Sequence, residues 1–163
     1  MNVDSLFTDG PLLAGRYIWI AAILLTALNT YVMRRRAPGA PTSLRHWLFA
    51  VLVAPWVLFG VLQFFGAIDT VWQLSRPSDL HLGTWIWYAY VFLQQLLITW
   101  WVLARDGARI VAESPLFVVH SALGQRSLKP GTAKLFAVLA PVVLVVGVCV
   151  AWSADFSIPR VAP

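Results

Sequence analysis

Residues 135–152 read LFAVLAPVVLVVGVCVAW, a run of eighteen residues without one charged side chain. An α-helix needs about 20 predominantly apolar residues to cross the hydrocarbon core of a bilayer. Three further stretches have similar length and composition: Leu12–Met33, Trp47–Phe65 and Trp85–Ala104. Arg16 is the only charged residue within the four, and it lies near a span end from which its side chain can reach the membrane surface. The sequence therefore predicts four transmembrane helices.

The composition of the whole chain leads to the same class of protein. Of its 163 residues, 60% are hydrophobic and 12% are charged, and the mean hydropathy is +0.74. Soluble domains carry about 25% charged and about 45–50% apolar residues. These values exclude a soluble enzyme and a disordered chain. We expect an all-α polytopic membrane protein in which residues 1–163 form a single integral membrane domain, a four-transmembrane-helix bundle.

The basic residues are distributed unevenly between the two sides of these spans. Nine of the twelve lie in the two segments that follow the first and third spans: Arg34, Arg35, Arg36, Arg45, Arg105, Arg109, Arg126, Lys129 and Lys134. Loops rich in Lys and Arg stay in the cytoplasm. The sequence therefore predicts a protein of the cell (inner) membrane with both termini outside the cytoplasm.

The segment between the third and fourth spans has its own pattern. Residues 108–113 continue with helical character, and Ser114–Pro115 interrupts them. The apolar stretch that follows, within 116–123, is too short to span and is flanked by basic residues. It predicts a short cytoplasmic interfacial helix against anionic headgroups, with docking of a cytoplasmic partner as the alternative. The residues expected to contact lipid headgroups are Arg34, Arg35, Arg36, Arg109, Arg126 and Lys129.

Neutral polar side chains are the only candidates for chemistry inside the spans. An amide in hydrocarbon costs several kcal/mol unless it is hydrogen-bonded, so these groups should face other helices or water. The candidate intramembrane cluster consists of Asn29, Gln63, Gln94, Gln95 and Thr99. The favoured interpretation is that they join helices by hydrogen bonds. The alternative is a cavity for a quinone, a lipid or a small solute.

Two adjacent glutamines in the third span point to different sides of a helix. Gln95 shares a face with Phe92 and Thr99, and we expect it to bond to the first or second helix. Gln94 lies about 100° away, on the side of Trp87 and Trp101, which suit a lipid-facing aromatic belt. The sequence thus predicts an inward Gln95 and an outward Gln94.

Proline residues interrupt two of the predicted helices. Pro55 lies inside the second span and Pro141 inside the fourth. A proline removes a backbone hydrogen bond and kinks a helix, which membrane helices tolerate when neighbouring groups compensate. We therefore expect a kink in each of these spans.

No residue pattern indicates catalysis, a metal or a cofactor. The single cysteine, Cys149, excludes an internal disulfide and a cysteine-based zinc site. The three histidines lie at different depths, which argues against haem or metal ligation. Phosphate loops, metalloprotease helices and nucleophile elbows do not occur in the sequence. We expect no enzymatic activity, no cofactor and no nucleic-acid partner.

Three functions remain after these exclusions. The first is a small non-enzymatic membrane protein, an accessory or self-associating component of a membrane complex, whose partners are anionic lipid and either a membrane protein or a second copy. The second is a transport or channel component lined by the neutral polar residues. The third is a membrane immunity or inhibitor protein that blocks a pore-forming toxin. The size of the chain is compatible with all three.

Overall fold

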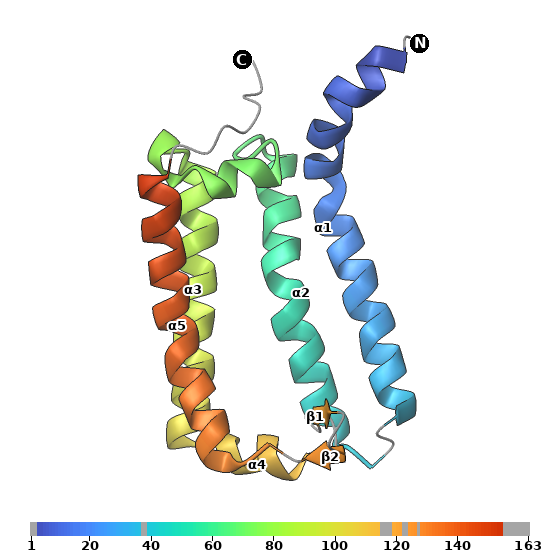
Figure 1. The fold of residues 1–163 in the computed structure, drawn as a ribbon, viewed down its shortest axis with the longest axis vertical. Helices are drawn as coiled ribbons and strands as arrows, with labels where there is room; N and C mark the ends of the chain where they lie inside the picture. Colours follow the sequence, from blue (N-terminus) through green and yellow to red (C-terminus); the bar gives the residue numbers. More distant parts are fainter. Residues whose placement is uncertain (1–2, 37–38, 115–118, 122–123, 127, 155–163) are drawn as a thin grey trace.

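The structure, a computed structural model, describes residues 3–36, 39–114, 119–121, 124–126 and 128–154. Four long helices run side by side over most of its length (Figure 1). They are α1 (Val3–Arg36), α2 (Thr42–Phe64), α3 (Leu82–Ala104) and α5 (Pro130–Ser153). Each contains a stretch that is long and apolar enough to cross a membrane. The predicted all-α class with four spans is confirmed.

The helices exceed the predicted spans at most of their ends. α2 begins five residues before Trp47, and α5 begins five residues before Leu135. α1 begins nine residues before Leu12 and ends at Arg36. These additional turns carry polar and charged residues, because a helix can continue into the interfacial region beyond the hydrocarbon core. Hydropathy therefore marks the membrane-crossing part of each helix and not its full length.

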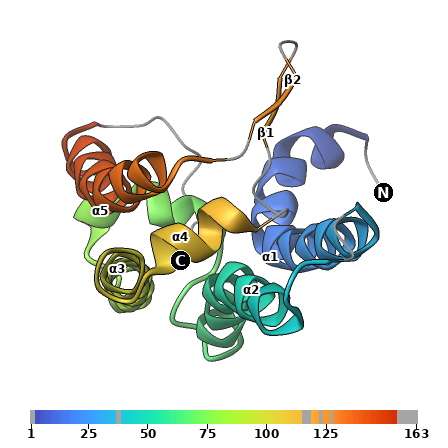
Figure 2. The ribbon, with the colours of Figure 1, turned by 90° about the horizontal axis from the view of Figure 1, so that it is seen from below.

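The four helices associate as an open row. α1 packs on α2, α2 on α3, and α3 on α5, whereas comparable packing between α1 and α5 is not found among the described residues. The view along the helices shows α1 and α5 at the two ends of this row (Figure 2). α3 thus has a long helix on either side of it, and α1 has one.

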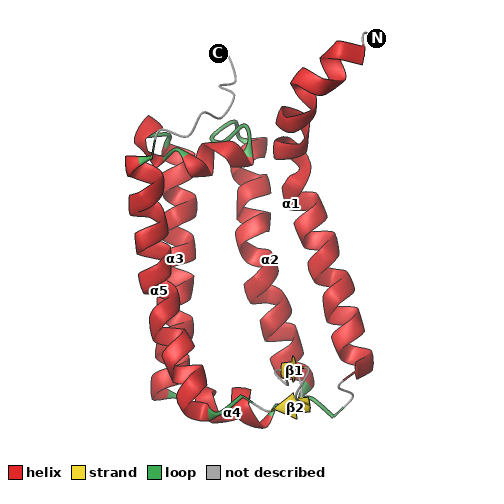
Figure 3. Ribbon diagram, viewed as in Figure 1, coloured by secondary structure: helices red, strands yellow, loops and turns green. Residues whose placement is uncertain are grey.

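A compact connection joins α2 to α3 at one end of the molecule, which we call the loop end. It contains the 3₁₀ helices η1 (Val71–Ser75) and η2 (Pro77–Asp79) (Figure 3). Ile68 from this connection is 1% exposed and packs with Phe59 of α2, which is 0% exposed. Gly83 allows the start of α3 to approach the connection closely, because a Cβ there would overlap the backbone carbonyl of Ala67.

The opposite end, which we call the basic end, carries α4 (Gly107–Glu113) and a short hairpin of β1 (Val119–Ser121) and β2 (Gly124–Arg126). The hairpin pairs Val119 with Arg126 and His120 with Gln125. α4 confirms the helical character predicted for 108–113. The interfacial helix predicted within 116–123 is wrong at 119–121, which form a strand, and the other residues of that stretch lie outside the described ones. β-Branched Val119 and the glycine at 124 suit a strand and a turn better than a helix.

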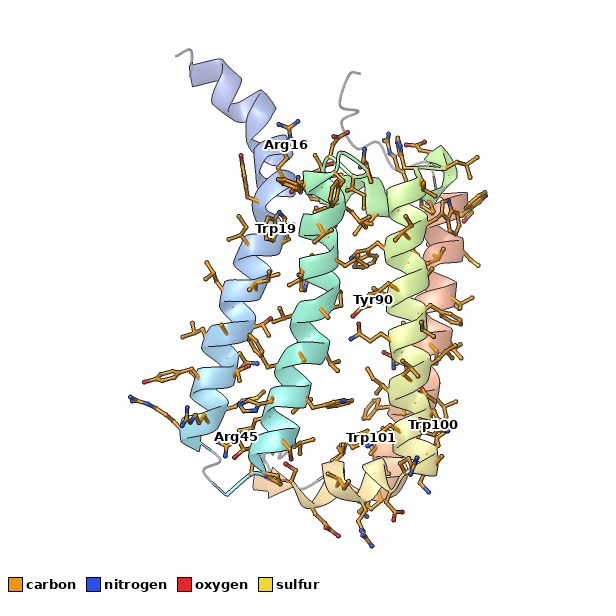
Figure 4. The ribbon with its side chains drawn as sticks, turned by 180° about the vertical axis from the view of Figure 1, so that it is seen from behind. Arg16, Trp19, Arg45, Tyr90, Trp100 and Trp101 are labelled. Atoms are coloured by element: carbon orange, nitrogen blue, oxygen red, sulfur yellow. The ribbon has the colours of Figure 1, made fainter. Side chains whose placement is uncertain are left out.

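The distribution of charge along the helices follows the fold. The loop between α1 and α2, the end of α3 and the start of α5 all lie at the basic end. This end therefore gathers Arg34, Arg35, Arg45, Arg105, Arg109, Lys129 and Lys134. Figure 4 shows Arg45 at this end and Arg16 at the other. The two groups of basic residues that the sequence placed on one side of the spans thus share one end of the molecule.

Candidate functional site

The proline inside α2, Pro55, creates a polar site in the middle of the molecule. Because Pro55 has no N–H, the carbonyl of Val51, four residues earlier, loses its helical donor. The side chain of Gln94 on α3 replaces that donor, with its Nε2 2.6 Å from the Val51 oxygen. The indole N–H of Trp87, also on α3, donates to the carbonyl of Pro55 itself over 3.0 Å.

The proline inside α5, Pro141, has an equivalent arrangement. Pro141 leaves the carbonyl of Ala137 without its helical donor. The hydroxyl oxygen of Thr99 on α3 lies 2.7 Å from this oxygen and 2.9 Å from the carbonyl of Gln95 in its own helix. The single hydroxyl proton can serve either acceptor. α3 thus supplies a side-chain donor to the carbonyl that each proline deprives of its partner.

Aromatic side chains add contacts at both ends of α3. Near the loop end, the rings of Trp85 on α3 and Trp152 on α5 lie 5.6 Å apart. Near the basic end, Trp101 on α3 lies 4.8 Å from Trp47 on α2. These four tryptophans lie near the ends of their helices, and their rings join neighbouring helices. Figure 4 shows Trp101 on the side of α3 that faces α2.

A second polar network lies at the loop end. The indole N–H of Trp19 on α1 donates to Oε1 of Gln63 on α2 over 2.8 Å, and Nε2 of Gln63 donates to the carbonyl of Asp69 over 2.6 Å. The backbone N–H of Asp69 donates to Oε1 of Gln73 over 2.8 Å. Both polar atoms of the Gln63 amide are therefore used to hold α1, α2 and the connection together.

The structure does not bring the five residues of the predicted cluster into one site. Gln94 and Thr99 bond to different helices in the middle of the row, and Gln63 belongs to the loop-end network. Asn29 is exposed on α1, and no described residue bonds to its side chain. Gln95 is half-buried, also with no side-chain bond to a described residue. These five residues therefore do not form a common cavity lining.

The expected orientation of α3 is wrong. Gln94, which we expected to face lipid, bonds to α2, whereas Gln95 makes no such bond. Trp87, expected in a lipid-facing belt, donates to α2 as well. Sequence reasoning missed the two acceptor carbonyls, Val51 and Ala137. The available signal was the position four residues before each proline, because that carbonyl must find another donor.

The residues expected to contact headgroups are exposed where their side chains are described. Arg34, Arg35 and Lys129 are exposed at the basic end. The guanidinium carbon of Arg35 lies 4.9 Å from the centre of the Tyr31 ring. Nε of Arg109 lies 3.8 Å from Oε1 of Glu113, one turn later. The side chains of Arg36 and Arg126 lie outside the described residues.

Two open grooves on the helix surfaces are mostly apolar. One, of about 340 Å³, lies between α3 and α5 and is lined by residues that include Trp85, Phe92 and Cys149. The other, of about 620 Å³, lies between α1 and α2 beside Trp19 and Gln63. Neither offers a set of acid, base or nucleophile, and no group of three metal-ligating residues occurs in the part of the chain that the structure describes.

The bonds of Gln94, Thr99 and Gln63 can hold the four apolar helices in fixed rotation. Their donors are neutral and are used within the chain. No protein-family model matches this chain, and neither a curated protein nor a solved structure shows significant similarity to it.

Proposed function

We propose that the chain is a non-enzymatic integral membrane protein that acts by association, as an accessory or self-associating component of a membrane complex. The observation that carries this proposal is the open row of helices. In that row, α3 uses its side-chain donors to fix its neighbours, while α1 has a long neighbour on one side only. Membrane helices associate through packing and interhelical hydrogen bonds, so the edge of such a row is suited to another helix.

The charge distribution supports a particular orientation. The basic end would lie in the cytoplasm and the loop end outside it, in agreement with the preference of basic loops for the cytoplasmic side. In this orientation Arg34, Arg35, Arg109 and Lys129 would meet anionic headgroups of the inner leaflet. A reporter that is active only in the cytoplasm tests this by fusion to either terminus. Strong activity of the C-terminal fusion would contradict the orientation.

A transport or channel function finds less support. A polar pathway needs side chains with free donors and acceptors along its length. The Nε2 of Gln94, the hydroxyl of Thr99 and both polar atoms of Gln63 already bond within the chain. Asn29 lies on the exposed surface of α1. The bonds of Gln94, Thr99 and Gln63 thus support a role in helix packing and not in a lining.

Chemical crosslinking in native membranes, followed by native mass measurement in mild detergent, tests the proposed function. We expect a species heavier than one chain, either a homo-oligomer or a defined hetero-complex. A chain that stays a lone monomer in both measurements would contradict the proposal. Single cysteines introduced at positions 94 and 95 provide a second readout. Because the bond of Gln94 to Val51 places position 94 against α2, a water-soluble thiol reagent should fail to modify a cysteine there.

A further inference from the structure

Asn29 is a polar group with no bonding partner in the described structure. The polar side chains next to it on α1 bond within their own helix. The hydroxyl of Thr26 donates to the carbonyl of Ala22 over 2.7 Å, and that of Thr30 donates to the carbonyl of Thr26 over 2.8 Å. The Asn29 amide has two donor hydrogens and one acceptor oxygen. It is exposed, and no described residue bonds to it.

The depth of Asn29 follows from the packing of α1 on α2. Trp19 bonds to Gln63, and the two helices run in opposite directions. Moving ten residues along α1 from Trp19 to Asn29 therefore corresponds to moving back from Gln63 to about position 53, since both helices rise about 1.5 Å per residue. Position 53 is two residues from Val51, whose carbonyl accepts the bond from Gln94 in the middle of the span. Asn29 thus lies at hydrocarbon depth, where an unbonded amide costs several kcal/mol.

The surface around Asn29 has the spacing of a helix-pairing seam. Ile18, Ala22, Leu25, Asn29 and Val32 follow one another at intervals of four, three, four and three residues. This is the heptad repeat of a left-handed helix pair, with Ala22 and Asn29 at a positions and the other three at d. Ile18 is 40% exposed and Leu25 is 65% exposed. Ala22 and Val32 are half-buried, and the small side chain of Ala22 allows a second helix to approach closely.

We infer that this seam of α1 binds the α1 helix of a second copy of the chain, with the two Asn29 amides hydrogen-bonded to each other. Two copies inserted with the same orientation place Asn29 at the same depth on both helices. An amide is complementary to another amide, because each provides a donor and an acceptor. A buried Asn at an a position also specifies a parallel pair in register. The inference rests on the proposed function and names the partner and the surface.

Energy transfer between donor-labelled and acceptor-labelled chains in bilayers, measured at increasing lipid-to-protein ratio, tests the seam. The variant Asn29→Leu should weaken association by about three- to thirty-fold, the range expected for an interhelical hydrogen bond. Asn29→Gln keeps an amide at that position and should retain most of the association. Thr26 and Thr30 bond within α1, so the helix itself should fold equally well in both variants, which circular dichroism checks.

Disulfide crosslinking locates the contact on α1. In a Cys149→Ser background, Leu25→Cys places a thiol on the seam, and Leu24→Cys places one about 100° away. The two leucines are matched controls because they are adjacent and are 65% and 64% exposed. We expect an oxidised dimer from Leu25→Cys and little from Leu24→Cys.

The outcomes separate this inference from the proposed function. A homo-oligomer that Asn29→Leu leaves intact, or that crosslinks through position 24 in preference to 25, would overturn the seam and leave association standing. A hetero-complex with no homodimer would do the same. A lone monomer at every lipid ratio and in native membranes would overturn both.

Discussion

Helices α3 and α1 each carry three neutral polar side chains in the basic-end half of their spans, and they use them in opposite ways. In α3, Gln94 and Thr99 donate to carbonyls of α2 and α5. In α1, Thr26 and Thr30 donate to their own helix, and Asn29 bonds to no described residue. The difference is that Gln94 and Thr99 meet backbone carbonyls of a neighbouring helix that have lost their helical donors, whereas the two threonines of α1 bond to carbonyls of their own helix.

Proline supplies the carbonyls that lack a helical donor. Pro55 and Pro141 lie in the two helices that flank α3, and the carbonyl four residues before each of them receives a bond from α3. The described part of α1 beyond position 13 contains no proline, and its threonines bond to carbonyls of their own helix. The two prolines therefore provide an acceptor for α3 in the helix on each side of it, whereas α1 and α5 lie at the two ends of the row.

The largest loss of stability is expected from a substitution that pushes the start of α3 away from the connection between α2 and α3. Gly83→Ala would place a methyl group against the carbonyl of Ala67, a backbone atom that cannot rotate away. Because packed interiors resist added volume, we expect the free energy of unfolding to fall by about 1–3 kcal/mol. Unfolding in mixed micelles with increasing SDS measures it.

Gly147→Ala is the matched control for that substitution. Gly147 lies in α5, and no atom comes within 4 Å of a Cβ placed there. Removing a glycine from a helix interior stabilises the helix by roughly 0.5–1 kcal/mol. A loss of stability equal to that of Gly83→Ala would show that the close approach at the loop end does not matter.

A smaller effect is expected from the bond between α3 and α5. Thr99→Val keeps the shape of the side chain and removes the hydroxyl donor, leaving the Ala137 carbonyl unbonded. We expect a loss of about 0.6–1.7 kcal/mol in the same unfolding measurement, the range found for interhelical hydrogen bonds in membranes.

The proline can be tested in the same background. Pro141→Ala restores an N–H that can bond to the Ala137 carbonyl within α5. If Thr99 acts by replacing that donor, Thr99→Val should cost clearly less stability in the Pro141→Ala variant, and a double-mutant cycle measures the difference. Equal costs in the two backgrounds would show that the proline-freed carbonyl is not the reason for this contact.

The smallest effect is expected for the same substitution in α1. Thr26→Val removes a hydroxyl that bonds only to the preceding turn of its own helix. Such bonds contribute little and can bend a helix, so the change in unfolding free energy should stay within about 0.5 kcal/mol. A cost as large as that of Thr99→Val would remove the contrast between the two helices.

Particular residues show how far sequence reasoning reached. The four spans and the gathering of Arg34, Arg45 and Arg105 at one end were predicted, because each depends on composition summed along a segment. The choice between Gln94 and Gln95 was wrong. The prediction of secondary structure was also wrong at 119–121, because an apolar run flanked by basic residues suits an interfacial helix and a strand alike.

The sequence by itself determined how many helices cross the membrane, which ends carry the positive charge, and which two carbonyls lose their helical donors at Pro55 and Pro141. Only the tertiary structure decided which side chain reaches those carbonyls. The physical reason is that a membrane helix is apolar on all sides, so no stripe of hydrophobic residues indicates which face is inward. Its rotation is set by packing against neighbouring helices, and 100° of rotation separates Gln94, bonded to Val51, from Gln95.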